Sequence, residues 1–151
     1  EQAITAVLVG RVPTASGYGK HRSVDTPLAD ALLRPVVDAI RDGGATPVVH
    51  SCAPDVPVSL LTGVGFAAIA FDLGLAQPSD AWAQAFEAGT DLWFGGAGAA
   101  RVEEFMGRLG FAPESFAARG AITPACGLAG STPRDARAAL ESAAKAASSL
   151  T

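Results

Sequence analysis

Four side chains of the kinds that bind metal ions follow short apolar runs of the sequence. His50 and Cys52 end the run TPVVHSC, Asp72 ends AAIAFD, and Cys126 ends ITPAC. Imidazole nitrogen, thiolate sulfur and carboxylate oxygen are the ligands that Zn²⁺ takes in proteins. Each piece alone has an ordinary explanation, since a cysteine is often a small core residue and an aspartate often closes a turn. Their shared position at the ends of apolar runs is what predicts a metal site.

The apolar runs predict buried β-strands, and the segments between them predict helices. Runs without polar alternation lie at 46–52, 66–73, 91–98 and 119–126, and such runs suit strands buried on both faces of a parallel sheet. The order is one helix, then strand and helix four times, which predicts an α/β fold with parallel strands and right-handed crossovers. The strand ends that carry the four side chains then meet at one rim of the sheet, where such folds build their sites.

Local signals mark the helices between these runs. The first helix has an apolar stripe that recurs every four residues and stops at two glycines, formed by Leu28, Leu32, Val36 and Ile40. Pro35 lies inside this stripe and is expected to kink or split the helix. Ser79 is predicted to cap the N-terminus of a later helix. Thr132, followed by Pro133, is predicted to begin the last helix, over 133–149.

Two architectures fit this order of elements. One is a flavodoxin-like open sheet, and the other is part of a (β/α)₈ barrel. A full barrel needs about 250 residues, so the 151 residues of this chain supply only about half of one.

Composition and charge narrow the classes of function. The chain is 49% hydrophobic and 17% charged, with a formal net charge of −4, which fits one globular domain with a sizeable core. Lysine and arginine are scattered singly, which argues against nucleic-acid binding. No apolar run has the roughly 18–20 residues of a membrane span, and no signal peptide is recognisable. Two cysteines do not make a disulfide framework, so we expect reduced thiols in a cytoplasmic protein.

Other segments carry weaker signals. The glycine-rich stretch 95–104 follows a strand and opens a helix, but it lacks the G-x-G-x-x-G spacing of a nucleotide site, so close backbone packing is the simpler interpretation. Ser16 and Ser51 lack the G-x-S-x-G elbow of a serine hydrolase, and His21 is the only histidine besides His50. The polar loop 10–25 fits either a mobile active-site loop or a surface connection.

The motifs VVHSCA, AIAFDL and ITPACGLAG resemble the catalytic barrel of the cobalamin-independent methionine synthase family, within the uroporphyrinogen decarboxylase/methionine synthase-like superfamily. In that family a His-x-Cys pair, a carboxylate and a cysteine in a C-G-L turn hold a catalytic zinc ion. The resemblance therefore implies zinc as the cofactor, and it implies the ligands His50, Cys52, Asp72 and Cys126. The family usually has glutamate where this chain has Asp72.

The same resemblance implies an activity and a set of partners. It implies a methyltransferase of the 5-methyltetrahydropteroyltriglutamate–homocysteine S-methyltransferase type, which moves a methyl group to the thiol of homocysteine or a similar small thiol. The family has a histidine at the end of the seventh barrel strand, where this chain has Phe94, Gly95 and Gly96. A methylated corrinoid, or another activated donor, therefore fits this chain better than methyltetrahydrofolate as the methyl donor. Two alternatives stay open: a metal-free decarboxylase or lyase of the same superfamily, and a non-catalytic zinc- or corrinoid-binding module.

The resemblance also implies how much of the fold is present. Residues 1–151 would form the C-terminal half of a (β/α)₈ barrel, that is, its last four βα units. We then expect the chain to be a piece of a longer protein, or to associate with the missing half-barrel or with copies of itself. The opening EQAI resembles the tail of the family's D-E-P-A-L segment, which makes Glu1 a candidate substrate-binding residue.

Overall fold

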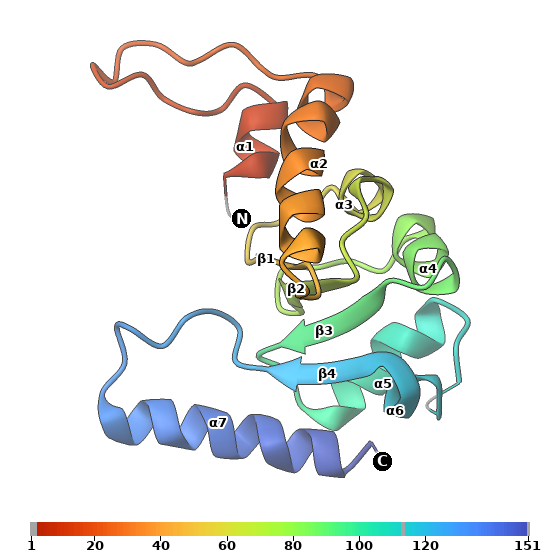
Figure 1. Ribbon diagram of the computed structural model, residues 1–151. Helices are drawn as coiled ribbons and strands as arrows, with labels where there is room; N and C mark the ends of the chain where they lie inside the picture. The colour runs from red at the N-terminus through yellow and green to blue at the C-terminus, as the bar shows by residue number, and fades with distance from the viewer. Residues whose placement is uncertain (1–2, 113, 151) are drawn as a thin grey trace.

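Four parallel β-strands form the centre of the structure, side by side in the order in which they occur along the chain (Figure 1). The structure is a computed structural model that describes residues 3–112 and 114–150. The strands are β1 (Val48–Ser51), β2 (Ala68–Asp72), β3 (Asp91–Gly95) and β4 (Gly120–Thr123). The parallel pairing of all neighbours confirms the predicted α/β class. The sequential order differs from the 2-1-3-4-5 order of flavodoxin-like sheets and is compatible with half of a βα barrel.

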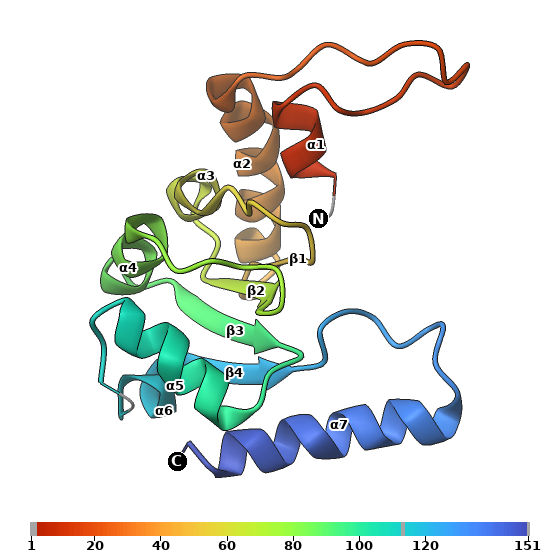
Figure 2. The ribbon, with the colours of Figure 1, turned by 180° about the vertical axis from the view of Figure 1, so that it is seen from behind.

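Helices alternate with these strands, as predicted, and two further helices are very short. Within the described residues they are α1 (Ile4–Leu8), α2 (Thr26–Asp42), α3 (Val58–Val64), α4 (Asp80–Glu87), α5 (Ala99–Arg108), α6 (Glu114–Arg119) and α7 (Pro133–Ser148). Helices α1 and α6 were not predicted from the sequence. Figures 1 and 2 show α2, α3, α4 and α5 following one another around the sheet. Among the described residues, no helix is long and apolar enough to cross a membrane.

Capping signals in the sequence mark the helix starts. Thr132 accepts a hydrogen bond from the backbone N–H of Asp135 at 3.2 Å and so caps α7, as predicted. Ser79 is the N-cap residue of α4, although its side chain makes no capping hydrogen bond within the described part of the chain. Asp25 caps α2 by accepting from the backbone N–H of Leu28 at 2.9 Å.

The helix α2 differs from its expected form. It runs unbroken from Thr26 to Asp42 with Pro35 inside it, so this proline does not split the helix. Pro35 lies on the exposed side of α2, where water can satisfy the carbonyl that loses its hydrogen bond. Three residues of the apolar stripe are more than half exposed, at 51%, 62% and 53% for Leu28, Leu32 and Val36.

One face of the sheet packs against the helices through an aromatic core. The rings of Phe71 on β2 and Phe94 on β3 are fully buried and lie 5.2 Å apart. Trp82 from α4 lies 4.2 Å from Phe71, and Phe105 from α5 lies 5.7 Å from it. Such aromatic contacts bury large apolar areas, so they fix α4 and α5 on this face.

The other face of the sheet carries His50. Residues paired across neighbouring strands share a face, and His50 is in register with Ala70, which is in register with Trp93. His50 and Trp93 are only partly buried, whereas Ser51 and Phe94, which follow them, are buried. The imidazole of His50 therefore projects on the side opposite the aromatic core.

Contacts of Arg119 connect the end of α6 to the start of β3. The Nε of Arg119 donates to the carboxylate of Asp91 at 3.1 Å, its Nη2 donates to the carbonyl of Thr90 at 2.9 Å, and its guanidinium lies 4.2 Å from the ring centroid of Phe86.

We expect Arg119→Met to lower the free energy of unfolding by about 1–2 kcal/mol, because these partly buried contacts are lost together. Arg134→Met removes an exposed ion pair on α7 and should cost less than about 0.5 kcal/mol. Urea unfolding of both variants measures the difference, and equal losses would contradict it.

Candidate metal centre

Three of the four predicted ligands come together at the C-terminal rim of the sheet. The ligand atoms of His50, Cys52 and Cys126 all lie within 4.8 Å of one another. His50 belongs to β1, Cys52 directly follows it, and Cys126 lies in the segment after β4. Tetrahedral zinc, with bonds of about 2.0–2.3 Å, separates its ligand atoms by roughly 3.3–3.8 Å. The three residues are thus close to the spacing that a single ion requires.

This meeting is not a consequence of strand order, because β1 and β4 are opposite edges of the sheet. Neighbouring strands lie about 4.8 Å apart, so a flat four-stranded sheet would separate its edges by roughly 14 Å. The sulfur atoms of Cys52 and Cys126 are nevertheless 3.4 Å apart and are not joined in a disulfide. The segments after β1 and β4 therefore reach toward each other across the ends of β2 and β3.

The end of β3 carries no side chain where the segment after β4 approaches it. A Cβ at Gly95 would lie 2.7 Å from the carbonyl oxygen of Phe71 and 3.1 Å from the Cα of Ala125. A Cβ at Gly96 would lie 2.8 Å from the Cβ of Ala125. Because Ala125 directly precedes Cys126, the two glycines allow the approach that brings Cys126 toward β1. This agrees with close backbone packing as the role of the glycine-rich stretch.

Asp72 ends β2, between the two edge strands, but is not a member of the three-residue group. Its Oδ1 accepts a hydrogen bond from the backbone N–H of Gly74 at 2.7 Å. This is the local turn that a short aspartate side chain forms readily. The structure therefore brings together three of the four predicted ligands and shows Asp72 bonded to the turn after its own strand.

Burial and the contact between the two thiols set the protonation of the group. Burial lowers the pKa of His50, because the imidazolium is less well solvated there, and the negative charge of Asp72 opposes this. The hydrogen bond with Cys126 raises the pKa of the Cys52 thiol, and burial adds to the effect. At neutral pH the free protein therefore holds a neutral His50, which is the form that binds metal ions, and a protonated Cys52.

Zinc binding should accordingly release protons from the thiols and none from the imidazole. Cysteine binds zinc as thiolate, so we expect about two protons to be released per zinc ion at neutral pH. The zinc affinity should therefore rise as the pH is raised, because protons compete with the metal for the Cys52 sulfur, whose pKa is raised. Calorimetric titration in buffers of different ionisation enthalpy counts these protons. A third released proton would show that His50 is charged in the free protein.

The remaining candidate residues do not join this group. Glu1 lies outside the described residues, so its predicted substrate contact stays a prediction. His21 is exposed on the loop between α1 and α2, which projects from the body of the molecule (Figures 1 and 2). Ser51 is fully buried, on the opposite face from His50. The role of Gly95 and Gly96 in shaping the centre was not predicted from the sequence, although two adjacent glycines within the predicted strand run 91–98 were the available signal.

Comparison of the chain with protein-family models, with curated proteins and with solved structures gives no match. Its function is therefore inferred from the chemistry of the group formed by His50, Cys52 and Cys126.

Proposed function

We propose that this chain carries the zinc centre of a methyltransferase that moves a methyl group to the thiol of homocysteine or of a similar small thiol. The observation that carries the proposal is the approach of His50, Cys52 and Cys126 to within 4.8 Å, although the two cysteines are 74 positions apart in the sequence. One nitrogen and two sulfur atoms are a ligand set that zinc prefers, and three protein ligands leave a position for a substrate, as in catalytic zinc sites.

Each residue of the group has a role in activating a substrate thiol. Zinc held there supplies one effect, the loss of the proton from a thiol that it binds. Cys52 and Cys126 contribute two negative charges, which keep the substrate sulfur electron-rich and nucleophilic. Asp72 is the candidate ligand that a substrate displaces, because its carboxylate has the Gly74 N–H as an alternative partner.

The end of β3 bears on the choice of methyl donor. Methyl transfer from methyltetrahydrofolate breaks a C–N bond, and the nitrogen that leaves needs a proton from an acid. Transfer from a methylated corrinoid breaks a C–Co bond, the electron pair stays on cobalt as Co(I), and no proton is needed. A side chain at Gly95 would begin 2.7 Å from the carbonyl oxygen of Phe71, so the backbone leaves no room there for a proton donor. This favours the methylated corrinoid.

We also propose that the sheet is the last half of a (β/α)₈ barrel whose first half another segment or chain supplies. The sequential parallel order of the strands is the order of a barrel, and His50 and Trp93 on the face opposite the aromatic core are only partly buried. Exposed sheet edges and apolar faces favour association. We therefore expect the 151-residue chain to associate, and sedimentation of a stable monomer at micromolar concentration would contradict this.

X-ray absorption spectroscopy at the zinc edge tests the proposed activity. We expect about two sulfur ligands in the zinc-loaded protein and about three after homocysteine is added. A sulfur count that homocysteine does not change would overturn the proposal. Protein that binds no zinc at all would favour the metal-free decarboxylase or lyase.

An assay of methionine formation, with methylcobalamin or with methyltetrahydrofolate as the methyl donor, identifies the donor. Turnover with methyltetrahydrofolate alone would contradict the proposed corrinoid donor.

A further inference from the structure

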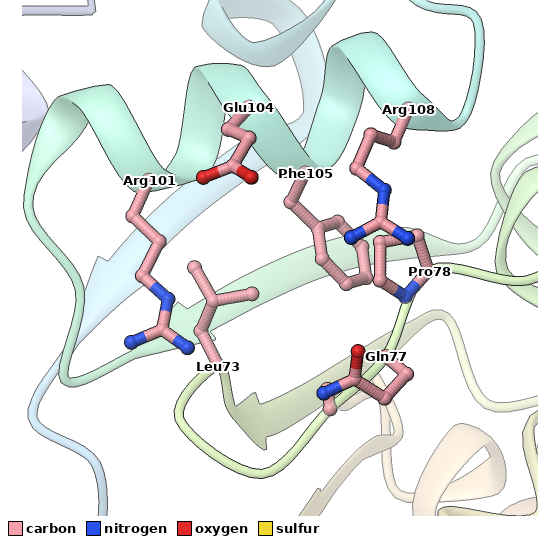
Figure 3. A pocket seen from close by; sticks show the side chains of 8 residues that line it. Leu73, Gln77, Pro78, Arg101, Glu104, Phe105 and Arg108 are labelled. Carbon is pink, nitrogen blue, oxygen red and sulfur yellow. The ribbon is translucent and has the colours of Figure 1, made fainter.

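A hollow of ≈ 90 Å³ lies between α5 and the segment that follows β2 (Figure 3). Its apolar floor is formed by Leu73, which is 2% exposed, and Phe105, which is 4% exposed, with Pro78 at one side. A hollow needs about 10–15 Å³ of such space to hold one water molecule, so this hollow has room for the head group of a small ligand. None of its lining residues belongs to the candidate metal centre.

Two arginines and one glutamate of α5 frame this hollow. Arg101, Glu104 and Arg108 lie three and four residues apart, which places them on one side of the helix. Figure 3 shows the two guanidinium groups on either side of the Phe105 ring, and both extend toward the segment after β2. From that segment Gln77 adds a carboxamide, which can donate and accept hydrogen bonds.

These three charged side chains form no ion pair within the described residues, although their spacing would allow one. No ion pair joins Arg101, Glu104 or Arg108 to any other described residue. A glutamate four residues before a basic residue is the favourable arrangement on a helix. On α2 the same spacing does form a pair, with Asp30 and Arg34 2.6 Å apart. On α5 the charged groups stay apart beside the hollow, where a ligand can contact them.

We propose that this hollow binds the zwitterionic head group of a free α-amino acid. The carboxylate of the ligand accepts from Arg101 or Arg108, its ammonium donates to Glu104, and its side chain lies against the apolar floor. A simple anion can pair with the arginines but leaves Glu104 without a partner, and a simple amine would be repelled by the two arginines. Only a ligand that carries both charges is complementary to all three groups.

Three probes of similar size test this directly. L-Alanine carries both charges, propanoate lacks the ammonium group, and ethylamine lacks the carboxylate. We expect L-alanine to bind at least about tenfold more tightly than either of the others, in NMR titrations that follow the side-chain N–H signals of Arg101, Arg108 and Gln77. Equal binding of propanoate and L-alanine would show a simple anion site and overturn the proposal. So would the absence of any shift at concentrations on the order of 10 mM.

Single substitutions test the role of each charge. Glu104→Gln should weaken L-alanine binding about tenfold and leave propanoate binding no weaker, whereas Arg108→Met should weaken both. Arg137→Met is the matched control, because Arg137 is an exposed arginine of α7 with Glu141 four residues on, and it should change neither. An unchanged L-alanine affinity in Glu104→Gln would overturn the proposal. Cys126→Ser should leave L-alanine binding intact, so failure of this proposal is distinct from failure of the zinc centre.

Discussion

Replacing Cys126 by serine should lower the zinc affinity of the protein by at least about a hundredfold. A serine hydroxyl stays protonated at neutral pH and is a much weaker zinc ligand than thiolate. Cys126 is exposed in the segment after β4, so its replacement should change the free energy of unfolding by less than about 0.5 kcal/mol. Competition with a chelator of known affinity measures the zinc affinity, and thermal unfolding without metal shows that the fold is intact.

Asp72→Asn is the informative companion to this variant. Asparagine keeps a side-chain oxygen that can accept from the Gly74 N–H, as Asp72 does now at 2.7 Å, so the turn after β2 should persist. Because Asp72 is not one of the three residues that converge, we expect its replacement to weaken zinc binding about tenfold or less. A larger loss for Asp72→Asn than for Cys126→Ser would make the carboxylate a primary ligand and would contradict the three-residue centre.

The elements that the sequence predicts well are those whose burial leaves a pattern in the residues. Four successive residues of β2 are buried, which leaves an unbroken apolar run, and Thr132 with Pro133 marks the start of α7 through its capping bond. The helices α1 and α6, with 5 and 6 residues, are too short to show a helical period. The stripe of Leu28, Leu32 and Val36 shows that α2 has an apolar side, but the periodicity of these residues does not show whether another element packs against that side.

The sequence predicts that the four candidate ligands lie at one rim of the sheet, but it does not predict which of them converge there. Parallel order alone places His50, Cys52, Asp72 and Cys126 at the same ends of their strands. It does not predict that segments from opposite edges meet, since that depends on how closely Ala125 approaches the end of β3. Nor does it predict the orientation of Asp72, because a short carboxylate can bond either to a metal ion or to the next turn.

Gly95→Ala should lower the free energy of unfolding by about 1–3 kcal/mol and weaken zinc binding about tenfold. The added methyl group would lie 2.7 Å from the carbonyl oxygen of Phe71 and 3.1 Å from the Cα of Ala125. Both are backbone atoms, so the contact can be relieved only if β2 or the segment after β4 moves. Movement of that segment displaces Cys126, which links the stability of this close approach to the metal centre. Urea unfolding and chelator competition on the same protein measure the two effects.

Gly107→Ala makes the same chemical change in α5 and should have the opposite effect on stability. A Cβ at Gly107 meets no atom within 4 Å, and alanine in a helix is favoured over glycine by about 0.5–1 kcal/mol. We expect this variant to be more stable than the wild type, with an unchanged zinc affinity. If Gly95→Ala were as stable as Gly107→Ala, the segment after β4 would be free to move away from β3. If Gly95→Ala were less stable than Gly107→Ala but bound zinc normally, the position of Cys126 would not depend on the close approach of Ala125 to the end of β3.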